Sequence, residues 1–220
     1  MQNLIEQEQF ELEVLDKLNS RRLLNQLVFT GGTMLRLCYG LNRFSVDLDF
    51  WVIKEIDTNK LFNDIKECLS QFYNITDAEN KFHTLLFELK SKNYPRSLKI
   101  EIRKEIKKIA TEKAIAYSKH SNLQVLATTP TLQEMMNSKI NAFLERKEIR
   151  DVFDIEFLFK KGLKLTDDRN TLTQILEVLD SLTKQDYTVK LGSILEAGQR
   201  QYYIQDNFKI LRMAIKEKLS

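Results

Sequence analysis

The sequence predicts an α+β fold, with a small mixed β-sheet and helices in the first part of the chain and a C-terminal helical bundle in the second. Three observations support this prediction. Short apolar runs alternate with helically spaced segments up to about residue 103, only long amphipathic segments follow Pro130, and 220 residues exceed one typical domain without reaching two large ones. We therefore expect a sheet-containing domain over residues 1–128 and a helical domain over residues 129–220.

The elements of the first domain follow in order from hydrophobic spacing. Apolar residues recur at helical spacing over residues 4–23, and residues 26–30 (QLVFT) form a short buried strand. Gly31-Gly32 interrupts this strand and a short helix follows. The expected elements after the two glycines are a helix over residues 33–39, a strand over 47–53, a helix over 59–72 and strands over 83–89 and 98–103.

The second domain is expected to be entirely helical. Its apolar residues recur three and four positions apart, which is the spacing of an amphipathic helix. The expected helices cover residues 131–145, 151–160, 171–182, 189–200 and 208–219.

The composition is that of a soluble globular protein. Hydrophobic residues make up 43% and charged residues 30% of the chain, which excludes a disordered chain, a collagen and a coiled-coil rod. There is no run of about 18 apolar residues and the N-terminal segment is polar, so we expect a cytoplasmic protein with no membrane partner. With two Cys and two His at unrelated positions, any catalysis is expected to use carboxylates and cations.

Basic residues are concentrated in one segment of the chain. The net charge is only +3, but between Lys90 and Lys119 ten Lys or Arg residues stand against three Glu. A polyanion would be attracted to such a segment, because binding it releases counterions. An ordinary solvated face of a charged strand or helix is an equally good interpretation.

Two glycines mark the first candidate binding feature. Gly31-Gly32-Thr33 follows an apolar strand and opens a helix, where backbone N–H groups and the helix dipole favour a phosphate. The alternative is a tight connection between a strand and a helix with no ligand.

Two aspartates mark the second feature. Side chains alternate along a strand, so Asp47 and Asp49 lie on one face while Leu48 and Phe50 enter the core. Two neighbouring carboxylates favour a hard cation such as Mg²⁺, although a solvated polar strand edge would give the same pattern.

A third carboxylate is offered by Glu101, which alternates with Ile100 and Ile102. On a strand next to Asp47 and Asp49 it would complete a three-carboxylate site for two metal ions. Because Lys99 and Arg103 lie on the same face, an ion pair is the competing interpretation.

These motifs resemble a known family. The segment GGTMLRLCYGLNRFSVDLDF, residues 31–50, resembles the glycine and DxD signature of the DNA polymerase β-like nucleotidyltransferases, in the form found in the AbiEii/AbiGii toxin family. Thr129-Pro130 followed by Lys139, Arg146, Arg150-Asp151 and Asp154 resembles the second block of that family.

The resemblance implies a role for each matching residue. Gly31, Gly32, Thr33 and Ser45 would hold the nucleotide, and Asp47 and Asp49 would bind Mg²⁺, with Mn²⁺ as an alternative and Glu101 as the third metal ligand. Lys139 corresponds to the lysine that contacts the nucleotide, and Asp151 corresponds to the acidic residue of the second block. The implied catalytic set is Asp47, Asp49, Glu101, Lys139 and Asp151.

The spacing of the second block adds a physical expectation. On one unbroken helix Lys139, Arg146 and Arg150 would form a cationic stripe able to bind phosphates, with Arg146 as a further nucleotide contact. Phe143 and Phe157 interrupt that stripe, so we expect a break between residues 145 and 149. Interhelical ion pairs made by Arg150, Asp151 and Asp154 are the alternative.

The predicted function is transfer of NMP from an NTP to an acceptor hydroxyl with release of pyrophosphate. The resemblance implies that the acceptor is the 3′ end of tRNA or another RNA, that the protein is the toxin of a toxin–antitoxin or phage-defence system, and that a cognate antitoxin is its partner. Two alternatives stay open: transfer to a protein or small-molecule hydroxyl, and a non-catalytic protein that binds a nucleotide and a partner.

Overall fold

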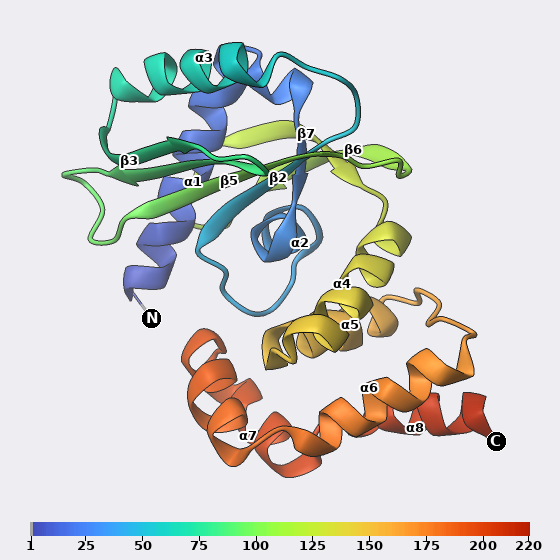
Figure 1. Cartoon of the computed structure of the whole chain (residues 1–220). Coiled ribbons are helices and arrows are strands. Elements are labelled where there is room, and N and C mark those ends of the chain that lie inside the picture. Colours follow the sequence, from blue (N-terminus) through green and yellow to red (C-terminus); the bar gives the residue numbers. More distant parts are fainter. Residues whose placement is uncertain (1) are drawn as a thin grey trace. The chain divides into compact units, whose positions relative to one another are not determined.

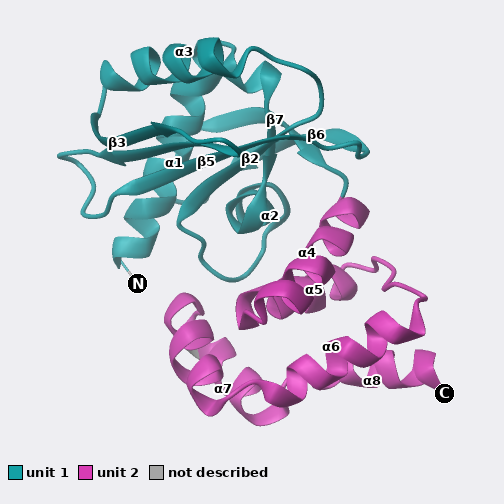
Figure 2. Ribbon diagram, viewed as in Figure 1, with its two compact units in different colours: residues 1–131 teal, residues 132–220 magenta. Residues whose placement is uncertain are grey.

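The chain forms two compact units, residues 1–131 and residues 132–220 (Figure 2). This is a computed structural model, and it describes residues 2–220 except for the side chain of Ala197. The units divide after Thr131, whereas the sequence places the boundary after residue 128.

The first unit contains a mixed five-stranded sheet, a two-stranded hairpin and three helices (Figure 1). Its elements are α1 (Gln2–Ser20), the 3₁₀ turn η1 (Leu23–Gln26), β1 (Val28–Thr30), α2 (Gly31–Tyr39), β2 (Asp47–Val52), α3 (Thr58–Ser70), β3 (Asn74–Asn80), β4 (Thr84–Lys90), β5 (Leu98–Ile106), β6 (Thr111–Tyr117) and β7 (Gln124–Pro130). The strand order is β1-β2-β5-β4-β3, and β6 pairs with β7 separately. Only β2 and β5 are parallel in the larger sheet.

One face of the five-stranded sheet carries the core of this unit. Residues of β2 alternate between buried and half-buried, so Leu48, Phe50 and Val52 face inward. Helix α3 lies along the sheet, and its Phe62 stacks on Phe87 of β4 with ring centroids 5.0 Å apart (Figure 1). Each fully buried side chain of this kind contributes about 1.5–3 kcal/mol. The opposite side chains of β2 include Asp47 and Asp49.

Two local signals set the ends of the helices near the sheet. Asp57 caps α3 by accepting from the backbone N–H groups of Asn59 and Lys60, at 3.0 and 2.9 Å. Helix α2 ends at Gly40, whose φ of 75° is the left-handed conformation common after a helix.

The second unit is helical. Its elements are α4 (Leu132–Arg146), α5 (Ile149–Lys160), α6 (Arg169–Ser181), a π-helical segment η2 (Asp186–Leu191), the 3₁₀ turn η3 (Gly192–Ile194), α7 (Ala197–Asp206) and α8 (Lys209–Leu219). Helix α4 packs against α5, and α6 packs against α8. Phe153, Tyr203 and Phe208 form an aromatic cluster in its core.

The predicted α+β class is therefore confirmed, as is the break between residues 145 and 149. Helix α4 ends at Arg146, Lys147 adopts a φ of 55°, and α5 begins at Ile149. The predicted helix over residues 189–200 is wrong. The backbone is extended at Leu195 and Glu196, so α7 begins only at Ala197. None of the described helices is long and apolar enough to span a membrane.

Candidate active site

The turn between β1 and α2 is enclosed by side chains from β2 and the loop before it. Gly31 has a φ of +81°, and a Cβ placed on it would collide with Oδ2 of Asp49. A Cβ on Gly32 would lie 2.6 Å from Nη2 of Arg43 and 2.8 Å from Oγ of Ser45. A larger residue at either position would therefore displace the side-chain end of Asp49, Arg43 or Ser45, and position 31 also favours glycine through its backbone conformation.

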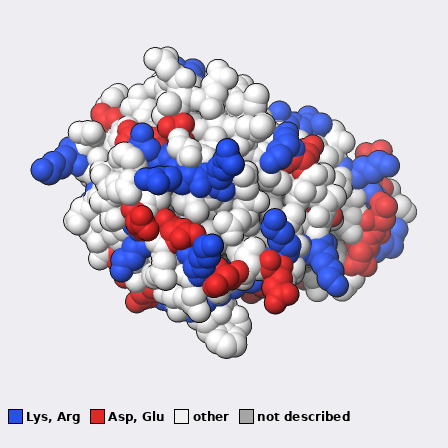
Figure 3. Space-filling model, turned by 90° about the horizontal axis from the view of Figure 1, so that it is seen from above, with Lys and Arg blue, Asp and Glu red and all other residues white. Residues whose placement is uncertain are grey.

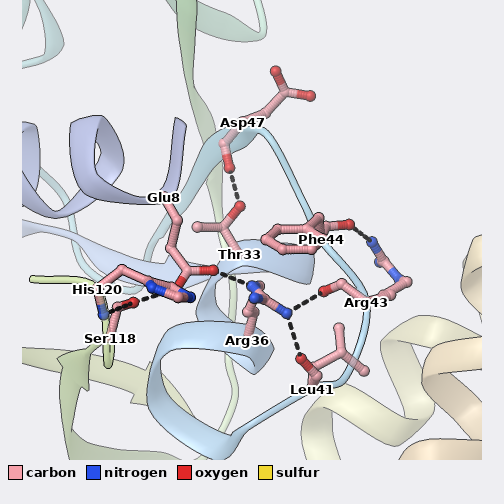
Figure 4. A network of polar contacts seen from close by, with 9 residues as sticks. All are labelled: Glu8, Thr33, Arg36, Leu41, Arg43, Phe44, Asp47, Ser118 and His120. Atoms are coloured by element: carbon pink, nitrogen blue, oxygen red, sulfur yellow. Dashed lines mark hydrogen bonds and ion pairs between the residues drawn. The ribbon is translucent and has the colours of Figure 1, made fainter. Parts of the chain in front are cut away.

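Asp47 and Asp49 occupy the half-buried face of β2, next to this turn. Oγ1 of Thr33 donates a hydrogen bond to the backbone carbonyl of Asp47 at 2.6 Å, which ties the start of α2 to the start of β2. Figure 4 shows the carboxylate of Asp47 pointing away from Thr33. The structure thus brings together Gly31, Gly32, Thr33, Ser45, Asp47 and Asp49.

Glu101 lies on the neighbouring strand, in register with Asp49. Its carboxylate accepts from Lys99 at 2.9 Å. This hydrogen bond is the main cause of the raised pKa of Lys99, and the charges of Asp47 and Asp49 add to it against partial burial. Within residues 2–220 no three His, Cys, Asp or Glu side chains are grouped as metal ligands. Glu101 lies beside Asp49 on the adjacent strand and is paired with Lys99.

The second block forms a buried ion cluster between α4 and α5. Nζ of Lys139 lies 3.2 Å from Oδ1 of Asp151 and 2.7 Å from Oδ2 of Asp154. Nη2 of Arg146 lies 2.9 Å from each oxygen of Asp151. The side chains of Lys139, Asp151 and Asp154 are 9%, 1% and 0% exposed. Two cations and two carboxylates thus balance in charge, while Arg150 is exposed.

Sequence reasoning missed three residues that hold the loop between α2 and β2. Arg36 donates to the backbone of this loop, Arg43 lies against Gly32, and Glu8 of α1 forms an ion pair with Arg36 (Figure 4). The two arginines lie inside the segment that matches the family signature, so their position was an available signal. Glu8 lies 28 positions before Arg36, and no local pattern indicates that contact.

The mixed sheet with two carboxylates on one face of a strand, beside a glycine turn that opens a helix, is the arrangement expected from the resemblance to nucleotidyltransferases. The comparison of sequences gives the family. The chain belongs to the AbiEii nucleotidyl transferase toxin family of type IV toxin–antitoxin systems, whose model matches residues 13–207.

Solved structures share the fold. A candidate nucleotidyltransferase from H. pylori aligns with a TM-score of 0.56 and 20% identity, covering 95% of this chain and 96% of that chain. JHP933 from Helicobacter pylori aligns with a TM-score of 0.54 and 21% identity, covering 92% and 94%. No curated protein matches the chain in sequence.

Proposed function

We propose that this nucleotidyltransferase toxin transfers NMP from an NTP to the 3′ end of an RNA, with tRNA as the acceptor. The observation on which the proposal rests is the placement of Asp47 and Asp49 on one face of β2, beside the Gly31-Gly32 turn. The same placement suits any acceptor hydroxyl, so the choice of RNA needs separate support.

The oxygen ligands of this site fit Mg²⁺, with Mn²⁺ as an alternative. Magnesium is commonly held by one or two carboxylates with the remaining positions filled by substrate phosphates and water, and Asp47 and Asp49 are two such carboxylates on one strand face. When bound, the ion neutralises phosphate charge and activates the acceptor hydroxyl. Asp47 and Asp49 would hold it.

The remaining residues of the first block position the nucleotide. In the proposal, backbone N–H groups at Gly31, Gly32 and Thr33 bind the triphosphate at the start of α2, where the helix dipole favours negative charge. Ser45, whose hydroxyl lies against Gly32, supports the same turn. Phosphoryl transfer needs mainly positioning and charge neutralisation from the protein, and this arrangement supplies the positioning.

Glu101 is proposed as the third carboxylate, and Lys99 as its partner before the nucleotide binds. Parallel pairing of β2 and β5 places Glu101 beside Asp49, which supports this role. The ion pair with Lys99 would have to open for Glu101 to bind metal. Replacing Lys99 with Met is therefore expected to change the Mg²⁺ dependence of activity if Glu101 is a ligand.

In the second block, we assign Lys139 and Arg146 to the phosphates of the nucleotide, and Asp151 to the orientation of both cations. Support comes from Asp151, which contacts the two cations at once. The two carboxylates hold the ammonium group of Lys139 in a fixed position, which favours phosphate recognition.

The RNA acceptor is supported by the basic segment around Glu101. Lys99, Arg103, Lys108, Lys113 and Lys119 are exposed, and the first two share a strand face with Glu101. On the face drawn in Figure 3, Lys and Arg are interspersed with Asp and Glu and form no continuous basic coat. We expect a polyanion to be attracted to this segment, because binding it releases counterions.

The test is a transfer assay with each α-labelled NTP, Mg²⁺ and total RNA, protein and small molecules from cells. We expect label on tRNA, at its 3′ end, and none with Asp47→Asn or Asp49→Asn. Asp77→Asn, on strand β3 of the same sheet, is the matched control and should keep activity. Label on protein or on a small molecule instead would contradict the RNA acceptor, and NTP binding without any transfer would support the non-catalytic alternative.

A further inference from the structure

The loop over residues 41–46 joins the helix that follows the glycine turn to the strand that carries Asp47. Arg36 of α2 organises this loop, because its Nη1 donates to the carbonyls of Leu41 and Arg43 at 3.2 Å each (Figure 4). Its guanidinium also lies 3.8 Å from the ring centroid of Phe44. One side chain thus contacts three residues of the seven-residue connection between α2 and β2.

Arg36 is itself fixed from α1. Its Nε forms an ion pair with Glu8, and the other carboxylate oxygen of Glu8 accepts from the hydroxyl of Ser118. The side chains of Arg36 and Glu8 are only 13% and 6% exposed. A charge-assisted hydrogen bond at this depth is stronger and less mobile than one at the surface.

Residues of this loop contact the candidate site directly. Nη1 of Arg43 donates to the carbonyl of Phe44 at 3.0 Å, and its guanidinium lies against Gly32. Ser45 lies against the same glycine, and Asp47 follows two residues later. A shift of the loop would therefore move the glycine turn and the first aspartate relative to each other.

We propose that Arg36, held by Glu8, is a positioning residue that sets the Gly31-Gly32 turn and Asp47 in the geometry needed to bind a metal-bound NTP. Arg36 acts through the loop and contacts no substrate. The inference rests on the proposed assignment of the turn to phosphate and of Asp47 to metal.

The guanidinium shape makes this role testable. A lysine at position 36 keeps the positive charge that faces Glu8, but it lacks the planar fork that serves two carbonyls and the carboxylate together. Glu8→Gln removes the charge that holds Arg36 and leaves the loop sequence intact. Glu13→Gln is the matched control, since Glu13 also lies on α1 and accepts from the hydroxyls of Tyr73 and Tyr94 at 2.8 Å each.

The experiment measures three quantities on the full chain: the Kd of each NTP with Mg²⁺ by calorimetry, amide hydrogen exchange over residues 41–46, and the Tm. For Arg36→Lys and Glu8→Gln we expect NTP binding weaker by about tenfold or more, to the same extent for all four NTPs, with faster exchange in the loop. Glu13→Gln should lower the Tm while the Kd and the loop exchange stay unchanged.

Each outcome decides the inference. Unchanged affinity and exchange in Arg36→Lys would overturn it while leaving the proposed function intact, and an equal loss of affinity in Glu13→Gln would show general destabilisation instead. If Arg36→Lys does not fold, Glu8→Gln decides alone. A wild-type chain that binds no NTP with Mg²⁺ would overturn both proposals, whereas intact binding without RNA labelling contradicts only the RNA acceptor.

Discussion

At the scale of single residues, two glycines share a backbone conformation and differ in their surroundings. Gly31 and Gly40 have φ values of +81° and +75°, but a Cβ on Gly31 would collide with Asp49 while one on Gly40 meets no atom within 4 Å. We predict that Gly31→Ala and Gly40→Ala each lose about 1–2 kcal/mol of unfolding free energy through backbone strain.

The two variants should differ in their affinity for an NTP with Mg²⁺. Only Gly31→Ala is expected to lose binding of an NTP with Mg²⁺, because only its methyl group displaces the Asp49 carboxylate. Urea denaturation gives the stability of both, and calorimetric titration gives the affinity. Equal affinity in both variants would show that the close approach of Asp49 to this turn is not needed for binding.

Glu11 is a buried carboxyl in α1, and neither of its oxygens has a hydrogen-bond partner among the residues that the structure describes. Burial raises its pKa well above 4.5, and the charges of Glu8 and Asp47 raise it further against the opposing effect of Arg36 and Arg96. A carboxyl with a raised pKa holds its proton in the folded state after the unfolded chain has lost it. Its effect on stability is therefore most favourable below pH 4.5 and is lost as the pH rises through the folded-state pKa.

Because the pKa of Glu11 is raised, we predict that Glu11→Met is more stable than the wild type at pH 7, by about 1–3 kcal/mol. The substitution removes a buried polar group that has no hydrogen-bond partner. The advantage should shrink as the pH falls toward 4, where the wild-type carboxyl is mostly protonated in both states. Thermal unfolding of the two proteins across pH 4–8 measures it. A constant difference over that range would indicate that Glu11 does not titrate as its surroundings require.

At the scale of elements, the sequence predicts those strands in which large apolar residues alternate with polar ones. β2 and β5 show this pattern in DLDFWV and LKIEIR, and both were predicted with the aspartates and Glu101 on one face. β3 was missed, because NITDAEN is a polar edge strand. β6 and β7 were missed because their buried residues include Ala116, Ala127 and Thr129, which give a weak hydrophobic signal.

The ion cluster of the second block shows a different limit of sequence reasoning. The break after Arg146 was predicted because Phe143 and Phe157 would interrupt a cationic stripe on one unbroken helix. Ion pairs between two helices were one of the interpretations. The pairing partners were not predictable, because Lys139 and Arg146 meet Asp151 only across the turn between two helices. Spacing along one helix says nothing about contacts made after the chain reverses.

The turn itself supports a stability prediction. Lys147 follows α4 with a φ of 55°, a conformation that glycine adopts without strain, and its N–H donates to the carbonyl of Phe143 at 2.8 Å. Lys147→Gly should raise the unfolding free energy by about 1 kcal/mol by relieving that strain. Lys161→Gly is the control: Lys161 has a φ of −81°, so glycine there should destabilise. Denaturant titration measures both, and a loss of stability in Lys147→Gly would refute the argument.

At the scale of the whole molecule, the two blocks of the family signature belong to different units. The first block lies within residues 1–131 and the second within residues 132–220. Inside the second unit two cations, Lys139 and Arg146, are paired with two carboxylates, Asp151 and Asp154, so the formal charges of this cluster balance without a ligand. Inside the first unit Asp47 and Asp49 share a sheet face with Lys99, whose pKa is raised mainly by its hydrogen bond to Glu101 and further by the charges of Glu101, Asp47 and Asp49. Carboxylates on one sheet face are ligands that a divalent cation would take.

The distribution of charge over the chain supports the last prediction. A net charge of +3 is too small to hold RNA by itself, so attraction must come from the basic segment between residues 90 and 119. The triple variant Arg103→Gln, Lys108→Gln and Lys113→Gln should weaken RNA binding about tenfold at low salt. It should also lower the slope of log affinity against log salt by about 2, since each single-strand phosphate contact contributes about 0.7.

The matched control replaces the exposed residues Lys54, Lys60 and Lys66 of the same unit with Gln. Filter binding from 50 to 200 mM KCl measures both variants, and the Kd of NTP with Mg²⁺ should not change in either. Equal losses of RNA affinity in the two triple variants would mean that net charge, and not the basic segment over residues 90–119, attracts the acceptor.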